Sequence, residues 1–195
     1  LFGFGFFLSG VSWVYVSLSV FGGMPWWLAG IAAFLFCAVM AIFPLLAGWC
    51  FKRWQPAAPW LQALFFAALI AAVDWLRSWI FTGFPWLAVG YSQAPPSPLA
   101  GFAPLLGVHG LSLLVALAGA LLLRWRVGLG FVALTVAAGY GLQQVPWTSP
   151  IGPPVSVALI QGNVPQEIKF RPEAFARTLT LYRELVAQNP AQLTL

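Results

Sequence analysis

The chain has 195 residues, of which 61% are hydrophobic and only 7% are charged. Such a chain has too little polar surface to cover a soluble globule, so we expect lipid to be its main solvent. The formal net charge of +5 does not indicate nucleic-acid binding, because the basic residues are not gathered on one face as phosphate contacts require. We therefore predict a membrane protein with no nucleic-acid partner.

Five apolar segments follow one another before residue 143, separated by turn-forming residues. A helix needs about 20 residues to cross the hydrocarbon core of a bilayer, within a range of about 17 to 25. The first four segments are long enough, and the fifth is short but contains glycines that suit close helix packing in lipid. The sequence thus predicts a polytopic α-helical membrane region over residues 1–142. Its expected spans are residues 1–20, 28–51, 60–80, 102–123 and 127–142.

The basic residues between these spans predict their orientation. All of them fall in the second and fourth connections, whereas residues 19–27 and 81–101, the first and third connections, contain no lysine or arginine. By the positive-inside rule the second and fourth connections are cytoplasmic. The third connection and everything after residue 142 then lie on the opposite side, which in a bacterium is the periplasm. The four basic residues are Lys52, Arg53, Arg124 and Arg126.

Aromatic residues are concentrated at the outer end of the third span and in the connection after it. Tryptophan and tyrosine prefer the membrane–water interface, so this concentration is typical of interfacial anchors. The same rings would suit a lipid-binding groove, and the two interpretations are compatible. The residues are Trp75, Trp79, Phe81, Phe84, Trp86 and Tyr91.

The composition changes after the last span. Residues 143–154 are rich in proline and predict a stiff linker, and charged residues of both signs return behind it. Residues 155–160 form an apolar run that suits a strand buried on both faces. A helix is expected after Pro172, and a second strand opens at Leu193. The predicted helix has an apolar stripe made of Phe175, Leu179, Tyr182 and Val186.

This order of strand, helix and strand is the first unit of an α/β domain, which we expect to begin at residue 155. Because the chain stops inside that unit, we expect the domain to continue beyond it. The chain also opens at Leu1 without methionine and without a basic flank, which is not typical of a signal peptide or a native N-terminus. We therefore interpret the sequence as a fragment of a longer protein.

Two charged residues lie inside the third span. Asp74 and Arg77 are three residues apart on one helical face, where the carboxylate and the guanidinium can neutralise each other. Intramembrane ionisable residues are functional candidates by default. So close to the interface, however, a structural ion pair that closes the helix bundle is the favoured interpretation.

Other reactive residue types do not form a site. Cys37 and Cys50 lack disulfide or metal spacing and are interpreted as small packing residues. His109 has no second ligand nearby, so a hydrogen-bonded interfacial residue is favoured over a metal site, with intramembrane acyl transfer as an alternative. No nucleotide-binding or serine-nucleophile motif occurs. From the residues alone we expect no metal and no cofactor, and no catalytic group can be assigned.

Three groups of residues resemble the apolipoprotein N-acyltransferase family of the bacterial inner membrane. The first is SWVYVS at residues 12–17 with FGGMP at 21–25. The second is DWLR at residues 74–77, continued by TGFPWL at 82–87 and GYSQ at 90–93. The third, VALIQGNVPQ at residues 157–166, is similar to the opening strand and loop of that family's nitrilase-like (carbon–nitrogen hydrolase) domain.

The resemblance implies an enzyme that transfers an acyl chain from a phospholipid to apolipoproteins. The implied donor is phosphatidylethanolamine, and the acceptor is the free amino group of the diacylglyceryl-modified N-terminal cysteine. In the family a cysteine forms a thioester, a glutamate acts as general base and a lysine stabilises the oxyanion. All three would lie beyond residue 195, so neither Cys37 nor Cys50 inherits a catalytic role. This fragment alone is therefore expected to be inactive.

The resemblance also directs attention to the acyl-chain route. Phe84, Pro85, Trp86 and Phe170 are expected to line that route, because they present apolar surface on the predicted periplasmic side. Phe170 stands where some members carry a functionally important tryptophan, and it keeps the ring without the N–H donor. Two alternatives remain: a non-catalytic membrane scaffold and a lipid transporter. A transporter would be expected to show internal repeats, and none is visible.

Overall fold

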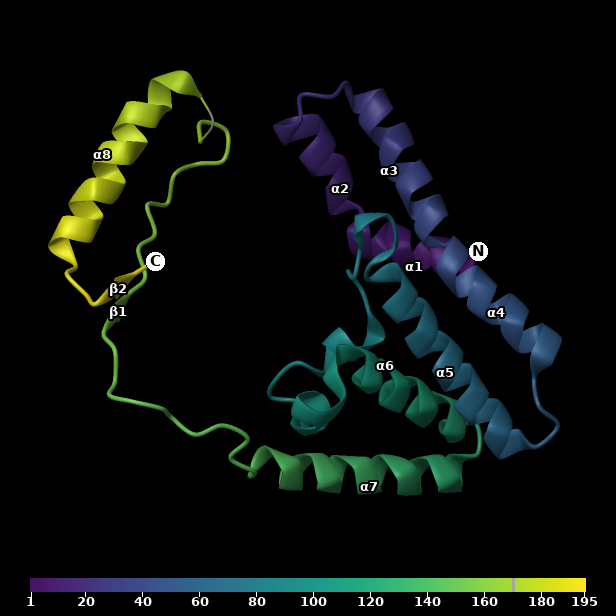
Figure 1. Ribbon diagram of the computed structural model, residues 1–195. Coiled ribbons are helices and arrows are strands. Elements are labelled where there is room, and N and C mark those ends of the chain that lie inside the picture. Colours follow the sequence, from purple (N-terminus) through teal and green to yellow (C-terminus); the bar gives the residue numbers. More distant parts are fainter. Residues whose placement is uncertain (170) are drawn as a thin grey trace.

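The computed structural model describes residues 1–169 and 171–195, and most of these residues are helical (Figure 1). Phe170, one of the predicted acyl-route residues, lies outside the described residues. The membrane part consists of α1 (Phe2–Val11), α2 (Trp13–Val16), η1 (Ser17–Phe21), α3 (Trp26–Met40), α4 (Ile42–Trp54), α5 (Pro59–Arg77), η2 (Ile80–Thr82), η3 (Val89–Gln93), η4 (Pro98–Phe102), α6 (Ala103–Leu122) and α7 (Trp125–Gln143). After the linker come β1 (Val157–Ala158), α8 (Pro172–Gln188) and β2 (Leu193–Thr194).

Four helical segments of the described chain are long and apolar enough to cross a membrane. They are Trp26–Trp54, Pro59–Arg77, Pro98–Leu122 and Trp125–Gln143. Most of their large apolar side chains are exposed, which water would penalise but the acyl chains of lipid would not. The structure therefore fits the polytopic helical region that the composition predicts.

The N-terminal segment, predicted as one span over residues 1–20, contains a bend. The α1 segment and the Trp13–Phe21 segment are bent by 48° about Ser12, so together they form one broken span or a re-entrant element. The hydroxyl of Ser9 donates to the carbonyl oxygen of Gly5 at 3.0 Å, a back-bond that often bends helices. The π-helical η1 adds a second irregularity. The apolar composition of a segment predicts its length, but it does not predict a bend within it.

The helices pack both against their sequence neighbours and against elements further along the chain. α5 packs against both α4 and α6, η3 packs on α6, and η4 packs on α7. An apolar cluster joins α1, α3 and α4, and its buried members are Phe7, Val11, Cys37, Met40 and Phe43. Cys37 therefore occupies a packing position, and Cys50 is a free, half-buried thiol.

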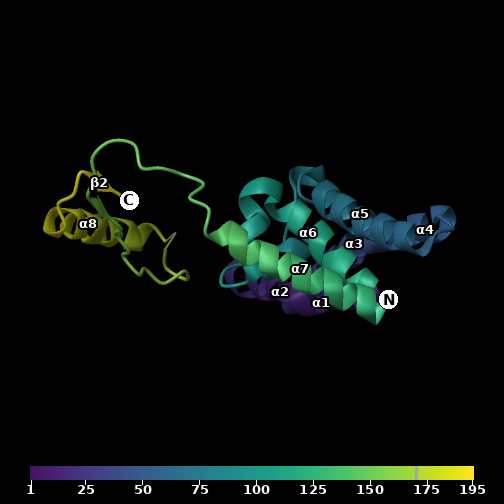
Figure 2. The ribbon, with the colours of Figure 1, turned by 90° about the horizontal axis from the view of Figure 1, so that it is seen from below.

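The C-terminal part begins an α/β arrangement. β1 and β2 pair in parallel, with Val157 opposite Leu193, and α8 connects them. Backbone hydrogen bonds extend the pairing, because the N–H of Ile160 donates to the carbonyl oxygen of Leu195 at 2.7 Å. Figure 2 shows this unit apart from the membrane helices, at the far end of the linker.

The faces of this unit are open, which differs from the expected strand buried on both sides. Within the described residues, Val157 is 49% exposed and Phe175 on the α8 stripe is 68% exposed. The ring of Tyr182 is an exception, because it packs over Gly162 of the loop that follows β1. A two-stranded ladder and one helix supply too little apolar surface to cover one another.

Candidate lipid-binding pocket and its buried polar support

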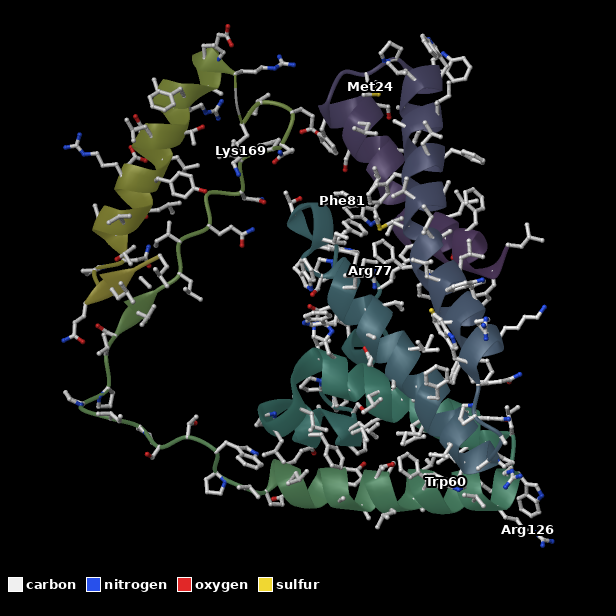
Figure 3. All side chains as sticks on the ribbon, turned by 45° about the vertical axis from the view of Figure 1, so that its right-hand side comes forward. Met24, Trp60, Arg77, Phe81, Arg126 and Lys169 are labelled. Atoms are coloured by element: carbon white, nitrogen blue, oxygen red, sulfur yellow. The ribbon has the colours of Figure 1, made fainter. Side chains whose placement is uncertain are left out.

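The last turn of α5 carries a buried ion pair. Asp74 is 6% exposed and Arg77 is 2% exposed, and Nη2 of Arg77 lies 3.1 Å from Oδ1 of Asp74. Figure 3 shows Arg77 among the helices, whereas Phe81 lies just beyond the C-terminal end of α5. In a low-dielectric interior, removing one partner of such a pair costs about 3–5 kcal/mol, because the other charge is left uncompensated.

The guanidinium of Arg77 also fixes the loop that follows α5. Its Nη1 donates to the carbonyl oxygen of Phe84 at 2.7 Å and to the carbonyl oxygen of Trp86. In return, the N–H of Phe84 donates to the carbonyl oxygen of Arg77 at 2.8 Å. The guanidinium carbon of Arg77 lies over the ring of Phe7 on α1, 5.3 Å from the ring centroid. One arginine therefore holds the loop backbone against α5 and α1.

Asp74 connects three elements through its second oxygen. Oδ2 accepts hydrogen bonds from the hydroxyl of Ser112 on α6 at 2.8 Å and from the N–H of Val89 in η3 at 2.9 Å. The hydroxyl oxygen of Ser112 in turn accepts a hydrogen bond from the N–H of Gly90 at 2.8 Å. We call Asp74, Arg77 and Ser112 the polar cluster. Its members satisfy one another, so it holds the loop in place without an orphaned charge.

The backbone of this loop is strained and closely packed. Phe81, Thr82 and Leu87 adopt positive φ angles of 53°, 77° and 62°, which non-glycine residues rarely do. Gly90 lies directly against the backbone of Val108 on α6, where a Cβ atom would overlap the carbonyl oxygen. Such a conformation persists only where surrounding contacts enforce it, and the polar cluster supplies those contacts.

Above the polar cluster the loop forms an apolar pocket of about 770 Å³. Residues that line it include Phe6, Pro85, Trp86, Leu87, Tyr91 and Ser92. Its size falls in the range of small-molecule pockets, which is about 300–1,000 Å³. We call it the loop pocket. Its nearly continuous hydrocarbon lining suits an acyl chain better than a polar ligand.

Two of the predicted acyl-route residues share the loop pocket and one does not. Pro85 and Trp86 line it, and the ring of Trp86 packs 5.7 Å from that of Trp13 on α2. Phe84 instead packs edge-on against Phe36 on α3, with ring centroids 4.8 Å apart. It lines a second cavity of about 460 Å³, and its ring stacks on that of Trp86 with centroids 5.9 Å apart.

Sequence reasoning missed several residues of this site. Phe6 lines the loop pocket from α1, the first half of the bent N-terminal segment, and the sequence did not indicate this contact. Ser112 looked like an ordinary residue of an apolar span. A polar residue inside such a span is expected to find a partner, and that signal could have identified it.

His109 differs from its prediction. It was expected to be hydrogen-bonded, but its buried Nδ1 atom has no partner among the described residues. Two residues earlier, Gly107 adopts a φ of 61°, which interrupts the helical geometry of α6. Among the described residues, no group of three or more His, Cys, Asp or Glu side chains could hold a metal ion.

Apolar helices of spanning length, with a buried polar cluster beneath an apolar pocket, define a polytopic α-helical membrane protein with a candidate lipid site. Residues 1–121 match the family described as the apolipoprotein N-acyltransferase N-terminal domain. The chain belongs to the apolipoprotein N-acyltransferase family, which confirms the resemblance seen in its motifs.

Relatives match nearly the whole chain. It is 50% identical to the apolipoprotein N-acyltransferase of Nitrosomonas europaea, over 98% of this chain and 40% of that protein. It is 44% identical to the one from Ralstonia nicotianae, over 98% of this chain and 38% of that protein. The corresponding protein of Pseudomonas syringae pv. tomato is 42% identical, over 96% and 39%. The chain thus spans about 40% of the length of these relatives.

Proposed function

We propose that the protein acts in lipoprotein maturation by transferring an acyl chain from phosphatidylethanolamine to the N-terminal diacylglyceryl-cysteine of apolipoproteins. The observation that carries this proposal is the apolar loop pocket, held over the buried polar cluster. Membership of the family supports the class of reaction. The donor and the acceptor follow from the resemblance.

The loop pocket would receive the acyl chain of the donor phospholipid. Burying apolar surface there is worth about 0.8 kcal/mol for each methylene group. The pocket opens at the end of the helices where Trp86 and Tyr91 present large rings, a position typical of the membrane interface. A lipid could therefore enter from the bilayer while its ester group stays near water.

The chemistry would take place in the remainder of the protein, beyond residue 195. A cysteine thiolate would attack the ester carbonyl of the phospholipid, forming a thioester and releasing the lysophospholipid as an alcohol. The acceptor amine would then attack the thioester and release the thiol. A glutamate would relay the proton, and a lysine would stabilise the oxyanion. These two acyl transfers balance without a cofactor and predict ping-pong kinetics.

We further propose that residues 155–195 begin the nitrilase-like catalytic domain, mounted on the periplasmic ends of the helices in the inner membrane. The amide of Gln143, at the end of α7, donates to the carbonyl oxygen of Ser97 at 2.9 Å. This contact supports the linker and the third connection emerging at the same end. Catalytic groups in open α/β sheets gather beyond the carboxyl ends of strands, so β2 would lead toward the catalytic glutamate.

Replacing Trp86 tests the proposed role of the loop pocket. In the full-length protein, Trp86→Ala should lower kcat/KM for acyl transfer about tenfold or more, a loss of about 1.4 kcal/mol in transition-state binding. Trp60→Ala is the matched control, because Trp60 is 63% exposed at the opposite end of α5 and Trp86 is 52% exposed. Equal activity of the two variants, with both folded, would show that Trp86 is only an anchor.

A further inference from the structure

The end of the helix bundle opposite the loop pocket gathers every basic residue of the membrane part except Arg77. Lys52 and Arg53 close α4, and Arg124 and Arg126 flank the start of α7. Figure 3 shows Trp60 and Arg126 together at this end, across the bundle from Phe81. We call it the basic end.

The positive charge at the basic end is not neutralised by protein groups. The sequence has only four acidic residues, and the three glutamates lie at or beyond residue 167. Asp74 lies 15 residues along α5 from Pro59, which is about 22 Å at 1.5 Å per residue. Among the described residues, no acidic side chain pairs with Lys52, Arg53 or Arg124.

A groove of about 490 Å³ opens between the helices at this end. Phe51 of α4, Phe66 of α5 and Leu121 of α6 give it apolar walls. Arg124 and Gln62 contribute the polar groups, and the amide of Gln62 donates to the carbonyl oxygen of Pro56 at 2.9 Å. We call it the basic-end groove. It combines a cation with an adjoining hydrocarbon channel, as a lipid headgroup and its chain require.

We infer that the basic-end groove binds an anionic phospholipid, with its phosphate on Arg124 and an acyl chain along the apolar wall that Phe51, Phe66 and Leu121 form. A guanidinium presents paired donors that match phosphate oxygens. The unneutralised charge of Lys52, Arg53 and Arg126 favours a headgroup with net negative charge over a zwitterionic one, whose ammonium group it repels. This lipid is distinct from the acyl donor proposed for the loop pocket.

Basic residues near membrane helices also set topology, and that role alone does not need a groove. The two roles differ in what they require of Arg124 and Arg126. Both arginines carry the same charge on the same connection, but only Arg124 lines the groove. Arg126 instead lies over the ring of Trp125, with its guanidinium carbon 5.1 Å from the ring centroid. A site therefore depends on Arg124 more than on Arg126, whereas topology depends on both equally.

The test measures the melting temperature of the full-length protein in detergent micelles as phosphatidylglycerol or phosphatidylethanolamine is added. Binding to the folded state raises the melting temperature, and the titration gives an apparent Kd. Phosphatidylglycerol should stabilise the protein more than phosphatidylethanolamine does. Arg124→Gln should raise the Kd for phosphatidylglycerol about fivefold, because one basic side chain near an anionic lipid contributes about that much to the affinity. Arg126→Gln should change this Kd much less.

A second pair of variants keeps every charge. Gly119 lines the groove, and a Cβ atom there would meet nothing within 4 Å, so Gly119→Leu should fill the groove without strain and weaken phosphatidylglycerol binding. Gly130→Leu on α7 is the control, because Gly130 is equally open but does not line the groove. Equal effects on phosphatidylglycerol binding within each pair of variants would overturn the site, because the loop pocket is unchanged in all four. If Arg124→Gln does not fold, the glycine pair decides.

Discussion

Both carboxylate oxygens of Asp74 have partners, but only Oδ2 joins α5 to other parts of the protein. Oδ1 pairs with Arg77 in the same helix, whereas Oδ2 binds Ser112 and the backbone of η3. The pairing of Asp74 with Arg77 follows from their spacing of three residues along a helix. The bond to Ser112 spans 38 residues and depends on how α5 packs against α6, which no local pattern encodes.

Ser112→Ala should destabilise the protein through this cluster. The change leaves the N–H of Gly90 and one bond of Asp74 without a partner in a buried setting, which costs about 1–3 kcal/mol. The melting temperature of the full-length protein should therefore fall. Ser9→Ala is the control, because the hydroxyl of Ser9 only bonds back to carbonyls of its own exposed helical turn. Equal melting temperatures for the two variants would contradict a supporting role for Ser112.

At the scale of elements, hydropathy located the helices but not their irregularities. The helix expected at residues 60–80 is α5 (Pro59–Arg77), and the one expected at 127–142 is α7 (Trp125–Gln143). The bend about Ser12 was not foreseen, because lipid accepts a bent apolar segment as readily as a straight one. The division into five spans stays a prediction, since the first of them is this bent pair.

The contact between η4 and α7 requires a residue without a side chain at one position. A Cβ atom on Gly139 would overlap the carbonyl oxygen of Pro98, and this backbone cannot move aside cheaply. Gly139→Ala should therefore destabilise the full-length protein by about 1–3 kcal/mol, as overpacking does. Gly141→Ala, one half-turn along α7, meets nothing within 4 Å and should be neutral or slightly stabilising. The measurement is the melting temperature of each variant. Equal melting temperatures for Gly139→Ala and Gly141→Ala would contradict a close contact between η4 and α7.

At the scale of the whole molecule, the proposed orientation places the basic end in the cytoplasm and the loop pocket toward the periplasm. Cysteines introduced by Ser97→Cys and Ser149→Cys should react with an impermeant thiol reagent added to the periplasmic side of the inner membrane. A cysteine introduced by Gln55→Cys should react only after the membrane is permeabilised. The background carries Cys37→Ala and Cys50→Ala. If only the Gln55→Cys variant reacted with reagent added to the periplasmic side, the orientation would be the reverse of the proposed one.

The features of the fold that could be predicted from the sequence are those encoded by a local pattern along the chain. Apolar length and the periodicity of the α8 segment are such signals, and the parallel pairing of β1 with β2 follows from their order around a helix. The orientation read from the basic connections stays a prediction. The loop pocket could not be predicted in the same way. It is assembled from Phe6 and a loop some 80 residues later, whose backbone is hydrogen-bonded to Arg77 and Ser112.

The central claim is that the full-length protein moves an acyl chain from a phospholipid to a lipoprotein amine. Purified full-length protein would be incubated with phosphatidylethanolamine and a peptide bearing an N-terminal diacylglyceryl-cysteine. The masses of the products would then be measured by mass spectrometry. The account predicts that the peptide gains one acyl chain on its amino group as one lysophospholipid is released. A folded protein that leaves the peptide mass unchanged would contradict the claim.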